Sequence, residues 1–413
     1  MKEIRILHTG DWHADSDPKK QDKLENSLDQ MLEYVQNVKV NAIVHTGDIW
    51  EKKQNYAEKS GVPLVVNYLK ALATHVDFVF ITKGNNSHDE VGSVSLLHQL
   101  EPNIYAFEYP AVLGVDSDGE EFAITDLLRS GFAPNEFNNP QYIVSLVPYP
   151  TKASFISNDS IDNNNTDFIE KFEQVFELIA DRTAEFTCPK VLGFHGNVVG
   201  SRLSSGQTLV SQDIMVAPRS LQLANHDYYA LGHIHMRQEV APNMVYSGSI
   251  YNKSWGETEQ KSFEIVEMFT DMDDDETFVE VQTERIFLTS ARPMVKIEAE
   301  FVPNDPHTDF IYDNDLSEEG FANAEVRIRV AVKENDRKLF TEDREAQLKR
   351  YFGQDVKIEL NVIPDERESR SQEIMNAKTL LDEVEEYAKV VKFEMTPSMK
   401  EKVLSIAGEE VEV

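Results

Sequence analysis

The first hundred residues alternate between short apolar runs and amphipathic stretches, and this alternation constrains the fold more than any other feature. Apolar runs at 4–8, 41–45 and 76–82 have the length and composition of buried strands. Between them, apolar residues recur every three or four positions over 24–38 and 62–74, as in helices that pack on one face. A strand–helix–strand–helix–strand order predicts a largely parallel sheet with crossover helices, which is an α/β fold.

A second group of strands is predicted after residue 190. The runs at 191–194, 228–231, 244–246 and 263–268 are expected to be strands, and a helix is expected over 167–186. So many further strands predict a second sheet packed on the first.

The length of the chain, 413 residues, is typical of two or three domains. Residues 1–290 hold the two predicted sheets. Residues 291–364 have strand-like alternation at 294–301 and a helical pattern at 337–352, which predicts a small α+β domain. Residues 365–413 begin with a charged segment and are predicted to form a linker and a helical tail.

The tail has the apolar spacing of a helix that packs on another helix. Six apolar residues follow one another at intervals of three or four, a narrower stripe than most globular helices bury. Thr396 and Pro397 then have the residue types of an N-cap and first helical position, so a second helix is expected there. Two such helices after a linker indicate docking onto another protein's helices, and the alternative is a hairpin folded back on its own domain. The first stripe consists of Ile374, Ala377, Leu381, Val384, Ala388 and Val391, and the second helix carries Met399, Val403 and Ile406.

The net charge and the cysteine content limit which partners and which cellular compartment are expected for this chain. The net charge is −33, which by itself argues against binding nucleic acid. DNA binding would then need metal ions at the site, a local basic patch or a partner subunit; acidity that serves solubility alone is the other interpretation. The single cysteine, Cys188, excludes an internal disulfide framework, and neither a long apolar span nor a signal peptide is evident. A cytoplasmic protein without a membrane span is the expectation.

Five short polar motifs occur in order along the chain, and most directly follow a predicted strand. Because strands of a parallel sheet end at the same edge, side chains far apart in sequence can meet there. Each motif supplies carboxylate, amide or imidazole ligands. The motifs are Asp11-Trp-His13, Gly47-Asp48, Gly84-Asn85, His195, and Gly232-His233-Ile-His235.

This set of ligands suits a pair of divalent ions. Two ions about 3.5–4 Å apart repel each other, so one carboxylate has to bridge them. Asp48 is the best candidate for the bridge, because it follows a buried strand and precedes a turn. Oxygen and nitrogen ligands without thiolate favour Mn, Fe or Zn over Ca or Mg. The ordered motifs therefore predict a two-metal phosphoesterase.

The motifs resemble those of the calcineurin-like metallophosphoesterase superfamily, D-x-H, GD, GN, H and GHxH. Within it, the chain looks most like the SbcD-type nucleases of double-strand-break repair. The segment Tyr229–His235 is followed by Tyr246-Ser-Gly-Ser249 and then Trp255-Gly-Glu257, and a small domain and a helical tail come after. The resemblance implies a two-sheet β-sandwich flanked by helices, with 291–364 as a capping domain that helps present DNA.

The resemblance also implies a ligand scheme and a catalytic pair. In that family a histidine beside the Asn ligand acts on the leaving group, and His88 with Asp89 would fill this role through a loop two residues longer than usual. Asn86 is an alternative to Asn85 as ligand, and Glu51 stands where Asp is common. Both metals are expected to be Mn²⁺. One would be held by Asp11, His13, Asp48 and His235, and the other by Asp48, Asn85, His195 and His233.

The implied function is that of a Mn²⁺-dependent DNA nuclease subunit that works with an SbcC-type coiled-coil ATPase in DNA repair and recombination. Homodimerisation is implied through 62–74 and 93–100, although packing on their own sheet explains the same apolar stripes. A metallophosphatase acting on small phosphoesters or phosphoproteins is the alternative, and a scaffold without metals is a third possibility. The implied ATPase contacts are Ile374, Leu381, Val384, Val391 and Val403, and the candidate DNA contacts are Lys52, Lys53, Lys83, Arg202, Arg237 and Lys253.

Overall fold

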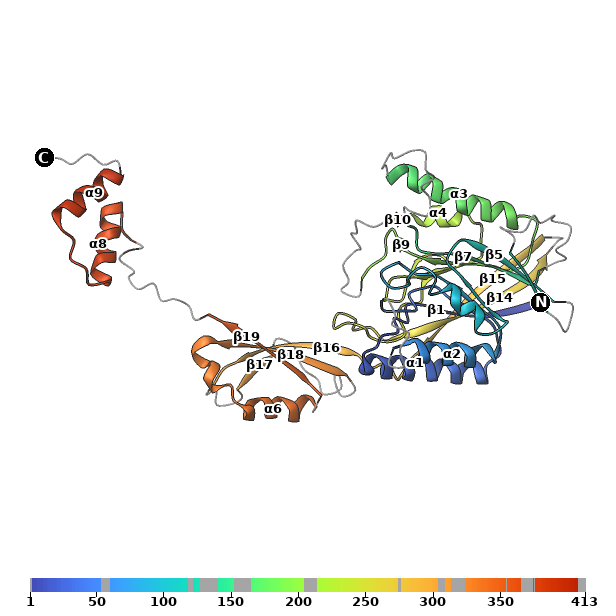
Figure 1. Ribbon diagram of the computed structural model, residues 1–413, viewed down its shortest axis with the longest axis horizontal. Coiled ribbons are helices and arrows are strands. Elements are labelled where there is room, and N and C mark those ends of the chain that lie inside the picture. Colours follow the sequence, from blue (N-terminus) through green and yellow to red (C-terminus); the bar gives the residue numbers. More distant parts are fainter. Residues whose placement is uncertain are drawn as a thin grey trace. The chain divides into compact units, whose positions relative to one another are not determined.

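Figure 1 shows the computed structural model of the chain, which forms two compact units. The first comprises residues 1–296, 316–327 and 352–356, and the second comprises 297–315, 328–351 and 357–413. The sequence-based domain boundaries at 290 and 364 stay predictions. The structure describes residues 2–52, 60–117, 122–126, 140–151, 165–203, 214–273, 276–303, 309–312, 324–353, 355–364, 374 and 376–407.

The first sheet has the predicted parallel centre. Its strand order is β15-β14-β1-β2-β3-β4, in which β1 to β4 run parallel while β14 and β15 are antiparallel. The crossovers are α1 (Pro18–Asn37) and α2 (Val62–Ala73), and a 3-10 turn, η1 (Ser95–Gln99), precedes β4. The strands are β1 (Lys2–Thr9), β2 (Val40–His45), β3 (Val76–Thr82), β4 (Ile104–Phe107), β14 (Ser262–Asp273) and β15 (Glu276–Phe287).

The second sheet has the order β12-β13-β11-β8-β7-β5-β6, and its four central strands, β13, β11, β8 and β7, are parallel. Its helices are α3 (Asn165–Thr183) and α4 (Pro218–Gln222), and the two-residue strands β9 (Asn197–Val198) and β10 (Met215–Val216) pair beside it. The strands are β5 (Ala111–Ser117), β6 (Phe122–Asp126), β7 (Tyr142–Val147), β8 (Lys190–His195), β11 (Tyr228–Gly232), β12 (Gln238–Ala241) and β13 (Met244–Tyr246).

Within the described residues, three apolar cores hold these layers together. One lies between the sheets, where Ile6 and Val44 of the first share a cluster with Val144 of the second. A second core packs α1 and α2 on the outer face of the first sheet, and a third packs α3 and α4 on the second sheet. The two helix pairs accordingly lie on opposite sides of the sheets in Figure 1. The predicted two-sheet sandwich flanked by helices is confirmed.

The first helix begins earlier than the apolar periodicity predicts. It starts at Pro18 rather than Leu24, because the Asp17 side chain caps it by accepting from Lys19 N at 2.9 Å. Proline at the first position supports this start, since its missing N–H would be unsatisfied there anyway.

The small α+β part of the chain contains a four-stranded sheet of order β17-β16-β18-β19. A single helix over 337–352 was expected, and that prediction is wrong at its start. Residues Glu334–Leu339 form a 3-10 segment, Phe340 leaves helical geometry at ψ 88°, and α6 spans only Glu342–Phe352. The strands are β16 (Met294–Phe301), β17 (Phe310–Tyr312), β18 (Glu325–Lys333) and β19 (Lys357–Ile363).

Among the described residues of the tail, α8 (Leu380–Val390) and α9 (Pro397–Ala407) pack on each other, with Lys400 Nζ 2.5 Å from Glu385 Oε1. The uninterrupted stripe expected from residue 374 onward is a wrong prediction, because Ile374 and Ala377 precede α8. The helix begins only where the Thr379 hydroxyl accepts from Asp382 N at 3.1 Å. Leu381, Val384 and Val403 are half-buried and Val391 is exposed.

Candidate metal centre

The predicted ligands lie together at one edge of the sandwich. Asp11 and His13 follow β1, Asp48 follows β2 and Asn85 follows β3 in the first sheet. From the second sheet, His195 ends β8, and His233 and His235 follow β11. Each sheet therefore contributes the carboxyl ends of its parallel strands, as expected for α/β folds.

One group of ligand atoms brings together Asp11, His13 and His235, within 4.8 Å of one another. His13 Nε2 lies 2.9 Å from His235 Nε2 and 3.9 Å from a carboxylate oxygen of both Asp11 and Asp48. Both aspartates are almost fully buried. The two imidazole nitrogens and the carboxylates thus point at one small volume.

A second group joins Asp48, His195 and His233 within the same limit. The same atom, Asp48 Oδ2, lies 3.4 Å from His195 Nε2 of this group and 3.9 Å from His13 Nε2 of the first group. Asp48 is therefore the carboxylate between the two groups. That position is what a bridging ligand requires.

The histidine hydrogen bonds fit a divalent metal at each group. His235 Nδ1 is 2.9 Å from Glu257 Oε1, and His195 Nδ1 is 2.5 Å from the Thr46 carbonyl oxygen. When Nδ1 donates in this way, Nε2 keeps a lone pair for a metal. Within the described part of the chain, His195 Nε2 is buried and has no hydrogen-bond partner. Oxygen and imidazole donors in a buried pocket are the ligands that Mn, Fe and Zn accept.

Asn85 and Asn86 face different neighbours. Asn85 Nδ2 donates to Asp48 Oδ2 at 3.0 Å, while its Oδ1 accepts from Ser87. Metal binding through the Asn85 oxygen therefore requires its amide to turn over. Asn86 Oδ1 instead accepts from Lys83 Nζ. Geometry favours Asn85 over Asn86 as the ligand.

Unusual backbone conformations occur at several of these positions. Asp11, His13, Asp48 and His233 all have positive φ, at 52°, 45°, 53° and 104°. A non-glycine residue in this region costs about 1–3 kcal/mol, and such residues cluster at functional sites. Gly84 permits the close approach, because a Cβ there would overlap the Asp48 carboxylate.

Burial and charge act in opposite directions on the ionisable groups. Burial disfavours the Asp48 carboxylate, but the adjacent His195 and His13 outweigh it and hold the pKa of Asp48 well below its usual range. Burial lowers the pKa of His13 to about 3 despite Glu51 beside it. Asp48 thus presents an ionised carboxylate and His13 a neutral imidazole, which are the forms that bind metal. His195 differs, because the Asp48 charge outweighs burial and raises the pKa of His195 to about 9. Metal binding at His195 therefore has to displace a proton.

His88 and Asp89, the predicted catalytic pair, lie in different environments. His88 Nδ1 contacts the Glu51 carbonyl oxygen, and its ring lies 4.6 Å from the His13 ring, at the edge of the centre. Asp89 is buried and accepts from the backbone N–H of Asp48, Trp50 and Gly84, at 3.0, 3.1 and 2.7 Å. Asp89 therefore ties together the two loops that carry Asp48 and Asn85. Burial and the Asp48 charge raise its pKa to about 7.

Three residues near the ligands were not predicted as part of the site. Glu51 Oε2 lies 3.3 Å from His13 Nδ1 and 2.7 Å from Lys253 Nζ. Glu257 orients His235, and the Tyr149 ring lies 5.5 Å from that of His233 and 6.0 Å from that of His195. The position of Tyr149 just after β7, at the same sheet edge, is the sequence signal that would have identified it.

Several candidate DNA contacts are engaged within the protein. Arg237 forms a bidentate pair with the buried Glu264 at 2.8 and 2.9 Å, and Lys253 pairs with Glu51. Lys83 is buried beside Asn86. Lys52 and Arg202 are exposed, whereas Lys53 is outside the described residues. DNA binding by Arg237 or Lys253 stays a prediction. Each of these side chains would have to contact a phosphate while it is paired with a carboxylate of the protein.

The sequence matches the calcineurin-like phosphoesterase family over residues 4–237. It is 26% identical over 315 residues to the D subunit of the nuclease SbcCD of Bacillus subtilis (strain 168), covering 72% of each chain. Among solved structures, it overlaps the 5′-nucleotidase precursor from Thermus thermophilus with 14% identity and a TM-score of 0.31, covering 71% of this chain and 56% of that one. None of the described helices is long and apolar enough to cross a membrane.

Proposed function

The chain belongs to the calcineurin-like phosphoesterase family, and from this we propose that it is a two-metal phosphodiesterase that cleaves DNA. The observation that carries the proposal is the position of Asp48, which lies between two groups of imidazoles at one sheet edge. A single carboxylate between two sets of nitrogen ligands supports a shared pair of ions rather than one isolated ion.

In the proposed ligand scheme, Asp11, His13, Asp48 and His235 hold one ion, and Asp48, Asn85, His195 and His233 hold the other. The ions, when bound, would polarise the phosphate and lower the pKa of a bound water. Carboxylate and imidazole donors without thiolate suit Mn, Fe or Zn, and the resemblance to SbcD-type nucleases makes Mn²⁺ the proposed metal.

In this proposal Asp89, Glu257 and Thr46 position the ligands, and His88 takes part in the chemistry. Asp89 keeps the Asp48 and Asn85 loops at a fixed separation through its three backbone hydrogen bonds. Glu257 and the Thr46 carbonyl fix the ring orientation of His235 and His195. His88, whose ring lies beside that of His13, would donate a proton to the leaving 3′-oxygen in this proposal.

The relative from Bacillus subtilis supports a nuclease that works as one subunit of a larger complex. We propose that the α8–α9 pair is the surface for a coiled-coil ATPase partner. Two features support this: a charged segment precedes the pair, and Leu380, Tyr387 and Val391 expose apolar surface. We also propose that 291–364 presents DNA to the site and that the protein is a homodimer.

Cleavage assays with purified protein separate the DNA nuclease from a metallophosphatase. We expect Mn²⁺-dependent degradation of linear duplex DNA, absent in excess chelator, and faster than hydrolysis of 4-nitrophenyl phosphate at equal concentration. Rapid hydrolysis of the monoester with intact DNA would instead identify a metallophosphatase. The Asp48→Ala variant, checked for folding by circular dichroism, excludes a contaminating nuclease.

A further inference from the structure

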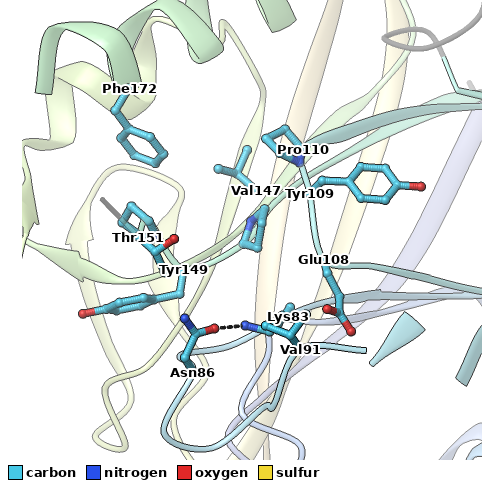
Figure 2. A pocket seen from close by; sticks show the side chains of 12 residues that line it. Lys83, Asn86, Val91, Glu108, Tyr109, Pro110, Val147, Tyr149, Thr151 and Phe172 are labelled. Carbon is cyan, nitrogen blue, oxygen red and sulfur yellow. Dashed lines mark hydrogen bonds between the residues drawn. The ribbon is translucent and has the colours of Figure 1, made fainter. Parts of the chain in front are cut away.

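A cavity of about 420 Å³ lies next to the metal centre. This volume is within the range of roughly 300–1,000 Å³ typical of small-molecule sites. It is bounded by the ends of β3 and β7, the β4–β5 connection and α3. Figure 2 shows the residues that line it, among them Lys83, Asn86, Tyr109, Tyr149, Thr151 and Phe172.

The cavity and the metal centre share residues. Tyr149 lines the cavity, and its ring also lies 5.5 Å from the His233 ring. Asn86 also lines the cavity, and it directly follows the proposed metal ligand Asn85 in the sequence. The Tyr149 N–H donates to the Lys83 carbonyl oxygen at 3.3 Å, which ties the β7 end to the β3 end. A molecule with one group at the metal centre can therefore extend into the cavity.

Most residues that line the cavity are aromatic or aliphatic, and Lys83 is the cation among them. Tyr109, Tyr149 and Phe172 contribute aromatic rings, and three prolines lie between them at 110, 148 and 150. Lys83 is only 6% exposed, and its Nζ donates to Asn86 Oδ1, as drawn in Figure 2.

Among the described residues that line the cavity, Glu108 is the carboxylate, and it is hydrogen-bonded to backbone N–H groups. Glu108 accepts from the N–H groups of Gly92, Val94 and Ser95 at 2.8–3.0 Å. These hydrogen bonds stabilise the turn before η1. Glu108 also lies close enough to Lys83 to oppose, together with Asp89, the lowering of the Lys83 pKa by burial. Aromatic walls beside a buried ammonium group match a flat heterocycle that carries a phosphate.

We propose that this cavity receives one nucleotide next to the scissile phosphate, its base against the aromatic walls and its backbone phosphate near Lys83. The inference rests on the proposed phosphodiesterase function and adds a substrate feature to it. A base in the cavity has left the duplex stack, which is easiest at single-stranded or frayed ends. The enzyme therefore prefers substrates with an unpaired base beside the cleaved bond.

Two chromogenic diesters test this without a duplex. Thymidine 5′-(4-nitrophenyl phosphate) carries a base, and methyl 4-nitrophenyl phosphate has the same leaving group without one. With Mn²⁺ we expect kcat/KM to be at least fivefold higher for the thymidine ester, the lower end of what stacking one base supplies. Tyr109→Ala, which removes a wall, and Thr151→Trp, which fills the cavity, should each reduce that ratio at least threefold.

A binding measurement without turnover tests the same comparison between ligands with and without a base. Thymidine 5′-monophosphate should bind at least fivefold tighter than deoxyribose 5-phosphate by calorimetry, and Thr151→Trp should remove the difference. Phe278→Ala, at an exposed aromatic on β15, is the matched control and should change neither ratio. Circular dichroism establishes that each variant is folded.

The outcomes separate the two proposals. Equal kcat/KM for both diesters, or a preference that both cavity variants retain, overturns the nucleotide cavity while the phosphodiesterase stands. Failure to hydrolyse either diester or DNA with Mn²⁺ overturns both proposals.

Discussion

Glu257 Oε1 lies 2.9 Å from Nδ1 of His235, and the same carboxylate contacts the buried Lys261 at 2.8 Å. The pair fixes the imidazole ring with Nε2 toward His13. Carboxylates behind metal-binding histidines typically contribute about 10–100-fold to metal affinity.

Replacing this carboxylate should therefore weaken one of the two metal positions. For Glu257→Gln we expect Mn²⁺ affinity at one site to fall about 10–100-fold, measured by isothermal titration calorimetry. Glu298→Gln, at an exposed glutamate paired with Arg329 at 3.5 Å, is the control. Unchanged affinity in Glu257→Gln would show that Glu257 has no role in orienting a ligand.

Gly84 tests how closely the β3 loop must approach Asp48. A Cβ at this position overlaps the Asp48 carboxylate, so Gly84→Ala has to displace Asp48 or its own loop. We expect at least about a hundredfold loss in kcat for DNA cleavage, consistent with small displacements in catalytic sites.

Gly92→Ala is the matched control for this substitution. Gly92 has φ of +89°, but a Cβ there has no atom within 4 Å. Backbone strain in Gly92→Ala should lower the free energy of unfolding by about 1–2 kcal/mol, as measured by denaturant titration. We expect little effect on kcat. If Gly84→Ala behaved like this control, the close packing around Asp48 would be irrelevant to activity.

His226 predicts part of the pH dependence of stability. It is buried, its Nε2 lies 2.8 Å from Ser145 Oγ, and burial lowers its pKa from 6.5 to about 4. The unfolded chain therefore takes up a proton between pH 6.5 and 4 while the folded protein does not. Stability from this group is complete above pH 6.5 and decreases as the pH falls through that window.

The difference between wild type and His226→Gln isolates that contribution. The free energy of unfolding of the wild type should fall more steeply with acidification, by up to about 1.4 kcal/mol per pH unit. Urea titrations at several pH values measure both slopes. Parallel slopes would mean that His226 titrates alike in the folded and unfolded protein.

Deleting residues 366–413 tests the proposed partner surface. The truncated chain should retain Mn²⁺ binding and lose co-purification with a coiled-coil ATPase co-expressed with it. A paired substitution, Leu381→Asp with Val384→Asp, should have the same effect without shortening the chain. Retention of the ATPase by both variants would rule out this role for α8 and α9.

The sequence predicts the parallel core and the position of the metal centre because both depend on local patterns. Apolar runs mark β1 to β3, and polar residues directly after them have to meet at one edge. The predictions that fail depend on competing local contacts, such as the Asp17 cap that lengthens α1 and the Thr379 cap that delays α8. The spacing of apolar residues does not predict these capping hydrogen bonds.

Neighbours from distant segments were the least predictable part of the site. Glu51 against Lys253, and Tyr149 against His233, depend on how loops from both sheets meet. The Arg237–Glu264 pair likewise joins residues 27 positions apart, with the carboxylate buried. Single-sequence patterns contain the residue types but not these contacts.

The number of bound ions is the most direct test of the two-metal account. Protein saturated with Mn²⁺ and freed of unbound metal should contain two ions per chain by plasma mass spectrometry, and Asp48→Ala should retain at most one. A single ion in the wild type, or two in Asp48→Ala, would contradict the shared role assigned to Asp48.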